Sequence, residues 1–372
     1  MTTPRHTEDR AEISPWVDKL GGFAARHARA FVSLGNFESW MLRDEIDATS
    51  IDRPIYIAGL ARSGSTILLE MLARSPDVAT HRYRDFPMVL TPRAWNWFID
   101  RAGDDSEEAK ERFHGDRIAV TSNSPEAFEE VIWMTFFEDA HDPSSSAVLD
   151  GACSNAEFER FYRDHIRKLV ALRGGARYLS KGNYNITRLG YLLALFPDAR
   201  FIVPVRDPVW HVASLIKQHR LFSREGSKDR RVVRHLRRTG HFEFGIDRRP
   251  INADDGETVQ RIVECWNSGR EVEGWAEYWA HVYGHVVDRL EHDAALAKAT
   301  RIVRYEALCA DPAGEMRSVL DHCALAEENM AEHAAEVVSP PRYYQPAFSN
   351  SEVHLIRERT AQTATRLARW TN

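Results

Sequence analysis

A short apolar segment that leads into a glycine loop and then into a helix-like pattern constrains this chain more than any other part of its sequence. The segment is Pro54-Ile-Tyr-Ile-Ala58, the loop is Gly59-Leu-Ala-Arg62-Ser63-Gly64-Ser65-Thr66, and a helical pattern follows over 67–72. An almost wholly apolar strand is typical of a parallel sheet covered on both faces. A helix that begins directly after such a loop presents unpaired backbone N–H groups and the positive end of its dipole to one point. The sequence therefore predicts a cradle for an oxyanion at the end of a buried strand.

The spacing of the glycines is that of the nucleotide-binding P-loop, with one departure. Ser65 stands where a P-loop has its phosphate-binding lysine, and the cation, Arg62, lies inside the loop instead. Three further segments look like parallel strands, and those at 200–205 and 301–305 are each followed by a helical pattern; the third covers 176–179. Because strand and helix alternate, we expect an α/β fold, a P-loop-like doubly wound parallel sheet flanked by helices with helical insertions.

The rest of the chain is predicted to be mostly helical. We expect a helical N-terminal extension over 1–50, an α/β domain over 51–350 and a C-terminal helix over 351–372. Within the domain, 222–256 is rich in arginine and glycine and is interpreted as a mobile basic insertion. Further helices are predicted over 125–137, 155–172 and 258–292. Gly269 and Gly274 are candidate breaks in the last of these helices.

Charge and cysteine content exclude several classes of protein. The chain of 372 residues has a formal charge of −6, so no overall basic excess attracts nucleic acid or anionic lipid. No apolar run approaches the roughly 20 residues of a membrane span, and the N-terminus has no signal-peptide pattern. The four cysteines form no CxxC pair, which suits neither a zinc site nor a disulfide framework. We therefore expect reduced thiols, a cytoplasmic location and no metal.

The loop residues resemble those of one enzyme family. Ala61-Arg-Ser-Gly-Ser-Thr66 is similar to the 5′-phosphosulfate loop of sulfotransferases that use 3′-phosphoadenosine 5′-phosphosulfate, in the arginine form seen in tyrosylprotein sulfotransferases and many bacterial relatives. The resemblance implies that Arg62 and the backbone of Ser63, Gly64, Ser65 and Thr66 bind the 5′-phosphosulfate. The alternative is a tight strand-to-helix turn without a ligand.

A second motif strengthens the resemblance. Phe201-Ile-Val-Pro-Val-Arg206-Asp207-Pro208 ends a predicted strand, and Ser214 follows about two helical turns later. Arginine and serine at this spacing resemble the family's 3′-phosphate site, and Lys181 resembles its lysine near the nucleotide. The alternative for Arg206 is a salt bridge with Asp207, which would also cap the next helix. Together with Tyr305 and Asp311-Pro312, the resemblance covers roughly residues 54–325.

The resemblance implies a sulfotransferase that moves a sulfuryl group from this donor to a hydroxyl acceptor, for which we expect a carbohydrate or a small molecule. Two other classes fit the loop less well. A P-loop kinase or NTPase needs Mg²⁺ held by the loop hydroxyl and a strand-end carboxylate, and Asp207 is the nearest imitation of that carboxylate. A catalytically inactive nucleotide-binding module would keep the fold without the chemistry.

Sulfuryl transfer to a hydroxyl requires a base that takes the hydroxyl proton. Candidates cluster in Thr80-His81-Arg82-Tyr83-Arg84-Asp85. Related enzymes carry a catalytic carboxylate a short interval after the loop, so Asp85 is the preferred base and His81 the alternative. Many relatives use glutamate instead of aspartate. The competing interpretation is that Asp85 caps a helix or pairs with Arg82 or Arg84.

The acceptor side is the least defined part of the sequence. Glu129 and Glu130 fit either substrate contacts or the acidic start of a helix. The basic insertion would attract an anionic acceptor such as an acidic polysaccharide, or it is simply a solvated helix face. Near the C-terminus, Arg342 is a candidate for a further 3′-phosphate contact, and a surface turn is the alternative.

Overall fold

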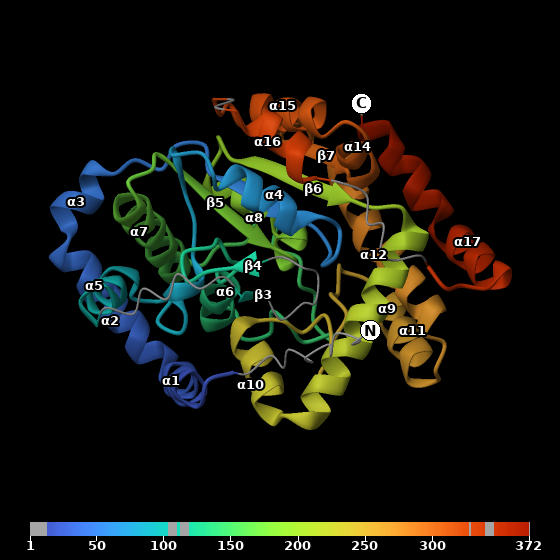
Figure 1. The fold of residues 1–372 in the computed structure, drawn as a ribbon, viewed down its shortest axis with the longest axis horizontal. Coiled ribbons are helices and arrows are strands. Elements are labelled where there is room, and N and C mark those ends of the chain that lie inside the picture. Colours follow the sequence, from blue (N-terminus) through green and yellow to red (C-terminus); the bar gives the residue numbers. More distant parts are fainter. Residues whose placement is uncertain (1–12, 103–109, 112–118, 327–328, 339–345, 372) are drawn as a thin grey trace, which may run out of the picture.

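Five parallel strands form the central sheet of the computed structural model, in the order β2-β5-β1-β6-β7. The structure describes residues 13–102, 110–111, 119–326, 329–338 and 346–371. The strands of the sheet run side by side through the middle of the molecule in Figure 1, and their bounds are β1 (Ile55–Ala58), β2 (Val78–Ala79), β5 (Arg177–Gly182), β6 (Arg200–Val205) and β7 (Thr300–Arg304). A separate antiparallel pair joins β3 (Lys110–Glu111) and β4 (Ala119–Val120).

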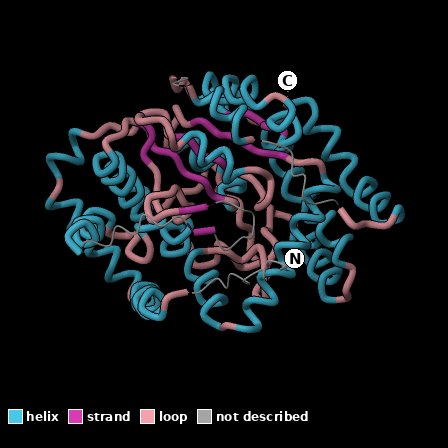
Figure 2. The backbone as a smooth tube through the Cα atoms, viewed as in Figure 1, coloured by secondary structure: helices cyan, strands magenta, loops and turns pink. Residues whose placement is uncertain are grey.

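Helices surround the sheet on both faces, as the cyan and magenta tubes of Figure 2 show. Their bounds are α1 (Pro15–Arg26), α2 (Ala28–Met41), α3 (Arg43–Ala48), α4 (Ser65–Leu72), α5 (Pro92–Ala102), α6 (Glu130–Phe136), α7 (Ala156–Arg173), α8 (Leu189–Leu195), α9 (Pro208–Lys228), α10 (Arg230–Thr239), α11 (Gly256–Asn267), α12 (Glu271–His292), α13 (Ala294–Ala299), α14 (Tyr305–Ala310), α15 (Pro312–Cys323), α16 (Met330–Val337) and α17 (Asn350–Leu367). Short 3₁₀ helices are η1 (Tyr83–Asp85), η2 (Tyr184–Thr187) and η3 (Ala368–Trp370).

Alternation along β1 divides the core into two layers. Ile55 and Ile57 belong to a cluster with apolar residues of α4, α15 and α16. Tyr56 and Ala58 belong to the larger cluster on the other face, with residues of α6, α7, α9 and α12. Successive side chains of a strand point to opposite faces, so a strand that is apolar at every position must be covered twice. This is the doubly wound α/β arrangement that the sequence predicted.

The predicted strands and most predicted helices are confirmed. The four strands expected from sequence correspond to β1, β5, β6 and β7, while the two-residue edge strand β2 was missed. The expected helix over 258–292 breaks at Gly269, whose φ of +77° is a left-handed conformation that favours glycine. Gly274, the second candidate break, lies inside α12. The stretch 222–251 is less irregular than predicted, because α9 and α10 occupy its first half.

Strand register brings the predicted site residues to one edge of the sheet. Ile57 of β1 pairs with Lys181 of β5 on one side and with Ile202 of β6 on the other. The loop after β1, Lys181 and Arg206 at the end of β6 therefore lie at the carboxyl edge of three neighbouring strands. Ligands of open α/β sheets bind at this edge.

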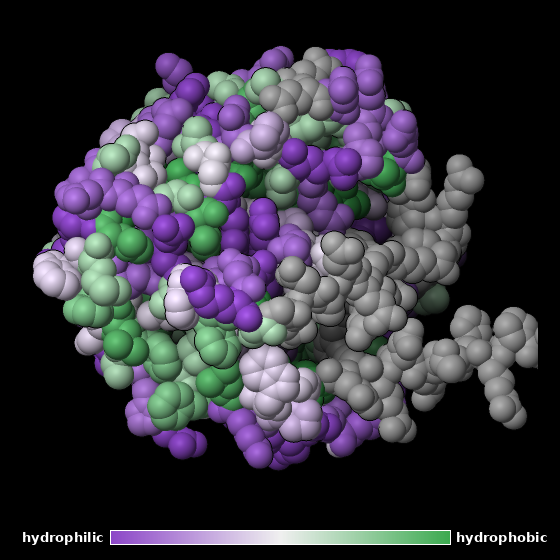
Figure 3. Space-filling model, turned by 60° about the vertical axis from the view of Figure 1, so that its left-hand side comes forward, coloured by the Kyte–Doolittle hydropathy of each residue, from purple (hydrophilic) through white to green (hydrophobic). Residues whose placement is uncertain are grey.

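The N-terminal helices form a surface with exposed apolar side chains. Figure 3 turns this side of the molecule forward and shows green hydrophobic areas among purple hydrophilic ones. The large exposed side chains of α1, α2 and α5 are Trp16, Phe23, Leu34, Phe37, Trp40, Met41, Trp97 and Phe98. In the described residues, no helix is long and apolar enough to cross a bilayer.

Candidate active site

The loop between β1 and α4 has the tight geometry that its glycines predict. Gly64 precedes the first residue of α4 and has a φ of +105°, and a Cβ built there would lie 2.7 Å from the ring of Tyr305. Arg62 also adopts a left-handed conformation, with a φ of +72°, and such strain in a non-glycine residue is often found at functional sites. The Ser63 amide donates to Leu60 O at 3.3 Å. Anion-binding amides are therefore expected from the first turn of α4, at Ser65 and Thr66.

His211 of α9 fixes the position of this loop through a hydrogen bond to Ala61 O. The sequence did not single out this residue. Trp279 Nε1 donates to His211 Nδ1 at 3.2 Å, so the proton of the neutral ring is on Nε2, which donates to Ala61 O at 2.9 Å. The ring is fully buried, and burial lowers the pKa of His211 to about 3. The imidazole therefore stays neutral and fixes the loop on α9 across a wide pH range.

Arg62 and Ser214, which were predicted to serve opposite ends of the donor, lie in contact. Arg62 Nε donates to Ser214 Oγ at 3.3 Å, and Ser214 lies on α9, the helix that follows β6. The 5′ loop and the predicted 3′-phosphate site are therefore adjacent. A ligand that fits both would lie along the edge of the sheet from Arg62 toward Arg206.

Arg206 lies at the end of β6, where the sequence predicts a phosphate contact. Its side chain is nine-tenths buried, its guanidinium carbon lies 4.9 Å from the centre of the Tyr305 ring, and its Nε has no hydrogen-bond partner in the described chain. Asp207 caps α9 by accepting from Val209 N at 3.0 Å and Trp210 N at 3.3 Å. The capping part of the alternative interpretation is thus confirmed. No ion pair between Arg206 and Asp207 occurs among the described residues.

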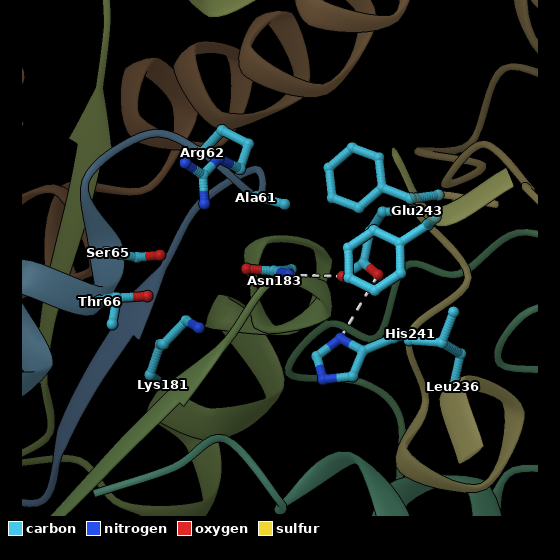
Figure 4. A pocket seen from close by; sticks show the side chains of 11 residues that line it. Ala61, Arg62, Ser65, Thr66, Lys181, Asn183, Leu236, His241 and Glu243 are labelled. Atoms are coloured by element: carbon cyan, nitrogen blue, oxygen red, sulfur yellow. Dashed lines mark hydrogen bonds and ion pairs between the residues drawn. The ribbon is translucent and has the colours of Figure 1, made fainter. Parts of the chain in front are cut away.

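A pocket opens beside the loop (Figure 4). One wall comes from the loop and β5 and carries Arg62, Ser65, Thr66 and Lys181. The opposite wall comes from α9, α10 and the segment after α10, and its residues are Phe222, Leu236, His241, Glu243 and Phe244. The rings of Phe222 and Phe244 stack with their centres 6.1 Å apart. The pocket therefore combines a cationic wall with a wall that is apolar except for a histidine and a carboxylate.

Those two polar residues form an ion pair that sequence reasoning missed. His241 Nδ1 lies 3.5 Å from Glu243 Oε2, and Asn183 Nδ2 donates to Glu243 Oε1. Burial alone lowers the pKa of His241, but the Glu243 carboxylate more than offsets it, so the pKa is raised above its usual value of 6.5. Burial raises the pKa of Glu243, and His241 more than offsets it, so that pKa is lowered from 4.5. The only available signal was a histidine two residues before a glutamate in a stretch read as irregular.

Asp85 and His81 do not line this pocket. The Asp85 carboxylate is fully buried and accepts from Arg173 Nη2 at 2.6 Å, Asn96 Nδ2 at 2.9 Å and Arg82 N at 2.8 Å. Burial alone would raise the pKa of Asp85, but contacts with His81 and Arg173 lower the pKa by more than burial raises it. The pKa therefore lies well below its usual value of 3.8. These contacts favour the capping and ion-pair interpretation, with Arg173 as the partner in place of Arg82 or Arg84. Asp85 as the base stays a prediction.

His81 belongs to the same buried cluster. Its ring stacks on that of His165 with centres 5.1 Å apart, and the two Nε2 atoms lie 3.2 Å apart. Its Nδ1 lies 3.6 Å from Asp85 Oδ2, and the side chain is 2% exposed. As a base, His81 would have to leave both partners.

Glu129 and Glu130 are core residues and face no open surface. Glu129 accepts from four side chains: Trp133 Nε1 at 2.9 Å, Tyr162 OH at 2.8 Å, Tyr178 OH at 2.6 Å and Asn185 Nδ2 at 3.3 Å. Glu130 pairs with both terminal nitrogens of Arg188, each at 2.8 Å, and with His141 Nε2 at 2.8 Å. The interpretation of these carboxylates as substrate contacts is therefore wrong, because every oxygen is already bound within the core.

Seven of the nine lysine and arginine residues of 222–251 form ion pairs with carboxylates. The ion pairs are Arg224–Glu225, Lys228–Glu225, Arg231–Asp229, Arg234–Asp18, Arg238–Asp18, Arg237–Asp247 and Arg248–Glu271. These seven basic residues share five carboxylates, so the ion pairs reduce but do not cancel the positive charge that would attract an acidic polysaccharide. Arg342, the remaining candidate, lies outside the described residues.

Neither a metal-binding cluster nor a disulfide occurs in the part of the chain that the structure describes. The described residues contain no cluster of three or more histidine, cysteine, aspartate or glutamate side chains that could hold a metal ion. The cysteines Cys153, Cys265, Cys309 and Cys323 are all free thiols, as the sequence predicts.

Comparison with known proteins identifies the family. A model of the sulfotransferase family matches residues 54–248, more than half of the chain. The chain belongs to the sulfotransferase family. A search of curated proteins finds none that matches it.

Two solved structures with a fold similar to that of this sulfotransferase are mycobacterial enzymes. Sulfotransferase STF9 from Mycobacterium avium is 14% identical, with a TM-score of 0.52, over 95% of this chain and 86% of that one. Sulfotransferase STF1 from Mycobacterium tuberculosis H37Rv is 15% identical, with a TM-score of 0.50, over 94% of this chain and 87% of that one. At this low sequence identity, the likeness to these two structures shows a shared fold and nothing more.

Proposed function

We propose that this sulfotransferase takes its sulfuryl group from 3′-phosphoadenosine 5′-phosphosulfate and transfers it to a hydroxyl acceptor. The observation that carries the donor is Arg206, a nine-tenths buried cation whose Nε lacks a hydrogen-bond partner in the described chain. A buried donor in this state requires an acceptor, and a phosphate oxygen supplies one. Its guanidinium lies over Tyr305, the ring that also lies against Gly64 of the loop, and this place near the loop fits a nucleotide with a second phosphate on the ribose.

Each residue of the loop has a distinct part in this proposal. Backbone N–H groups at the start of α4, with the hydroxyls of Ser65 and Thr66, bind the 5′-phosphosulfate. Arg62 stabilises the negative charge that builds on the leaving phosphate. Lys181, which lines the pocket beside the loop, holds the sulfuryl oxygens. Arg206 and Ser214 hold the 3′-phosphate, and Arg342 remains a candidate for a further contact.

The pocket wall opposite the loop supports one class of acceptor. Phe222, Leu236 and Phe244 provide an apolar surface next to the polar pair of His241 and Glu243. Such a wall fits a small molecule with an apolar body and a hydroxyl group better than a polyanionic carbohydrate. The four free thiols agree with a reducing compartment, and we propose the cytoplasm as the location.

Calorimetric titration tests the donor. We expect adenosine 3′,5′-bisphosphate to bind without Mg²⁺ and to compete with the donor. Magnesium-dependent binding of ATP, with no binding of the bisphosphate, would instead identify a P-loop kinase or NTPase. Binding without any transfer to a panel of small phenols and alcohols would identify an inactive nucleotide-binding module.

A further inference from the structure

Three polar side chains that line the pocket have no part in the donor binding proposed above. His241 and Glu243 follow α10, and Asn183 follows β5. In Figure 4 they face Arg62, Ser65 and Thr66 across the pocket. A group placed there would lie in the same pocket as the residues proposed to bind the phosphosulfate.

The amide of Asn183 indicates that a ligand binds in this pocket. Its Nδ2 must donate to the Glu243 carboxylate, which fixes the orientation of the amide. Its Oδ1 is then buried without a hydrogen-bond partner among the described residues, and Figure 4 shows this oxygen turned away from Glu243 toward the loop. Buried acceptors in native proteins are almost always satisfied. A ligand that brings an O–H or N–H group into the pocket would satisfy this one.

His241 and Glu243 have the geometry of an oriented base. Glu243 is 3% exposed, is held by Asn183 on one oxygen, and faces His241 Nδ1 with the other at 3.5 Å. A carboxylate at Nδ1 places the proton of the neutral ring there and leaves Nε2 as the atom that accepts a proton. The His241 side chain remains 24% exposed and lines the pocket. It is thus more accessible to an acceptor hydroxyl than Asp85 or His81, which are buried and do not line it.

We infer that His241 is the base that removes the acceptor's hydroxyl proton, with Glu243 as the residue that positions its ring. This inference rests on the proposed function. As the hydroxyl oxygen forms its bond to sulfur, the O–H bond breaks and the proton moves to Nε2 of His241. The bond between sulfur and the bridging oxygen breaks at the same time, and its electron pair leaves with the 5′-phosphate of adenosine 3′,5′-bisphosphate.

The charges around His241 set the pH at which this base works. Glu243 and Glu126 favour the protonated ring, while Lys181 opposes it, and His235 of α10 is also close enough to interact. Because Glu243 raises the pKa of His241 above 6.5, the neutral ring appears at a higher pH than for an ordinary histidine. The rate should therefore rise with pH through a value above 6.5. In Glu243→Gln this limb should move to lower pH.

The experiment measures transfer from ³⁵S-labelled donor to three probes: water, phenol and catechol. We expect His241→Asn to lower kcat for transfer by about 10²–10⁴-fold, while the Kd of adenosine 3′,5′-bisphosphate changes less than about twofold. Unchanged binding shows that the variant is folded. The matched control is His333→Asn, because His333 Nδ1 also faces a carboxylate, Glu336 Oε2, at 3.7 Å, but does not line the pocket. The control should retain parent activity.

Failure of the base and failure of the function give different results. His241→Asn with parent kcat and parent Kd would overturn the base alone, as would Asp85→Asn that binds the bisphosphate normally but is inactive per folded molecule. A pH limb that does not move in Glu243→Gln would overturn the positioning role of Glu243. A parent protein that does not bind the bisphosphate would overturn the proposed function itself.

Discussion

Arg62 Nε donates to Ser214 Oγ at 3.3 Å, which ties the loop after β1 to the helix after β6. His211, one helical turn before Ser214 on α9, donates to Ala61 O in the same loop. The two elements that the proposed donor would bridge are therefore held in register by the protein itself. Such preorganisation reduces the entropy lost when the donor binds.

We expect Arg62→Ala to lower the rate of transfer more than donor affinity. A cation next to a leaving group acts mostly on the charge that develops in the transition state, and loss of one such donor costs about 10²–10³ in kcat. Arg62→Lys should restore part of the rate. Steady-state kinetics with labelled donor, together with titration of the bisphosphate, separates the two effects. Full activity in the alanine variant would remove Arg62 from the mechanism.

Arg206→Ala should weaken binding of adenosine 3′,5′-bisphosphate by about 2–3 kcal/mol, because a charge-assisted hydrogen bond to the 3′-phosphate is lost. Binding of adenosine 5′-phosphosulfate, which lacks that phosphate, should hardly change. Arg200→Ala is the matched control, since Arg200 lies at the opposite end of the same strand. Equal losses for the two ligands would show that Arg206 supports the fold instead.

Gly64→Ala should disrupt the loop. The φ of +105° is strained for alanine, and the new Cβ would lie 2.7 Å from the Tyr305 ring. We expect a loss of about 1–3 kcal/mol in the free energy of unfolding, measured in urea, together with weaker bisphosphate binding. Gly256→Ala serves as the control, because a Cβ there meets nothing within 4 Å. If both variants behave alike, the loop does not require its glycine.

Stability should fall as the pH drops below about 6.5. Burial lowers the pKa of His211 to about 3 and those of His235 and His285 to about 4. Between these values and 6.5, the unfolded chain binds protons that the folded protein does not, so acid favours unfolding. Each such histidine contributes up to about 1.4 kcal/mol per pH unit.

Urea unfolding at pH 7 and pH 5 measures this slope. His285→Gln should make it shallower, whereas the variant His292→Gln, at an exposed position, should leave it unchanged. A His285→Gln slope identical to that of the parent would show that this ring is protonated in the folded state.

Asp85→Asn should destabilise the protein without removing its activity per folded molecule. The substitution leaves the buried Arg173 guanidinium without its charge partner, which costs about 3–5 kcal/mol in the free energy of unfolding. Asp100→Asn is the control, because the Asp100 carboxylate is exposed and its ion pair with Arg84 lies at the surface. A stable Asp85→Asn variant whose kcat falls by about 10²–10⁴-fold would identify Asp85 as the base after all.

Local patterns in the sequence were sufficient to predict four of the five strands of the sheet. Strands such as Arg200–Val205 are continuous apolar runs, and Pro208 after Asp207 marks the start of α9. The same reasoning located Arg206 because an arginine at the end of a buried strand has a predictable position. The edge strand Val78–Ala79 was missed because two residues carry no periodicity.

Contacts between distant segments could not be predicted in this way. The sequence gives no sign that Trp279 orients His211, or that Glu129 accepts from four side chains of the core. The many arginines of α10 concealed its helical pattern in the sequence, although Val232, Val233 and Leu236 are apolar positions of this helix. Because the partners of those arginines lie elsewhere in the chain, the wall that carries His241 was read as an irregular insertion.

Asp18 of α1 joins the N-terminal helices to this wall. It binds Arg234 at 2.6 Å and Arg238 at 2.7 Å, and these arginines lower its pKa from 3.8 to about 2, so the carboxylate stays charged in mildly acidic solution. The helix that presents Leu236 and leads to His241 is therefore fixed by a helix from the N-terminal part of the chain. In a chimera with a relative, α10 would have to be exchanged together with α1, because either helix alone would bring unmatched charges to the junction. Substrate preference in this enzyme would be inherited through a pair of helices that lie more than two hundred residues apart.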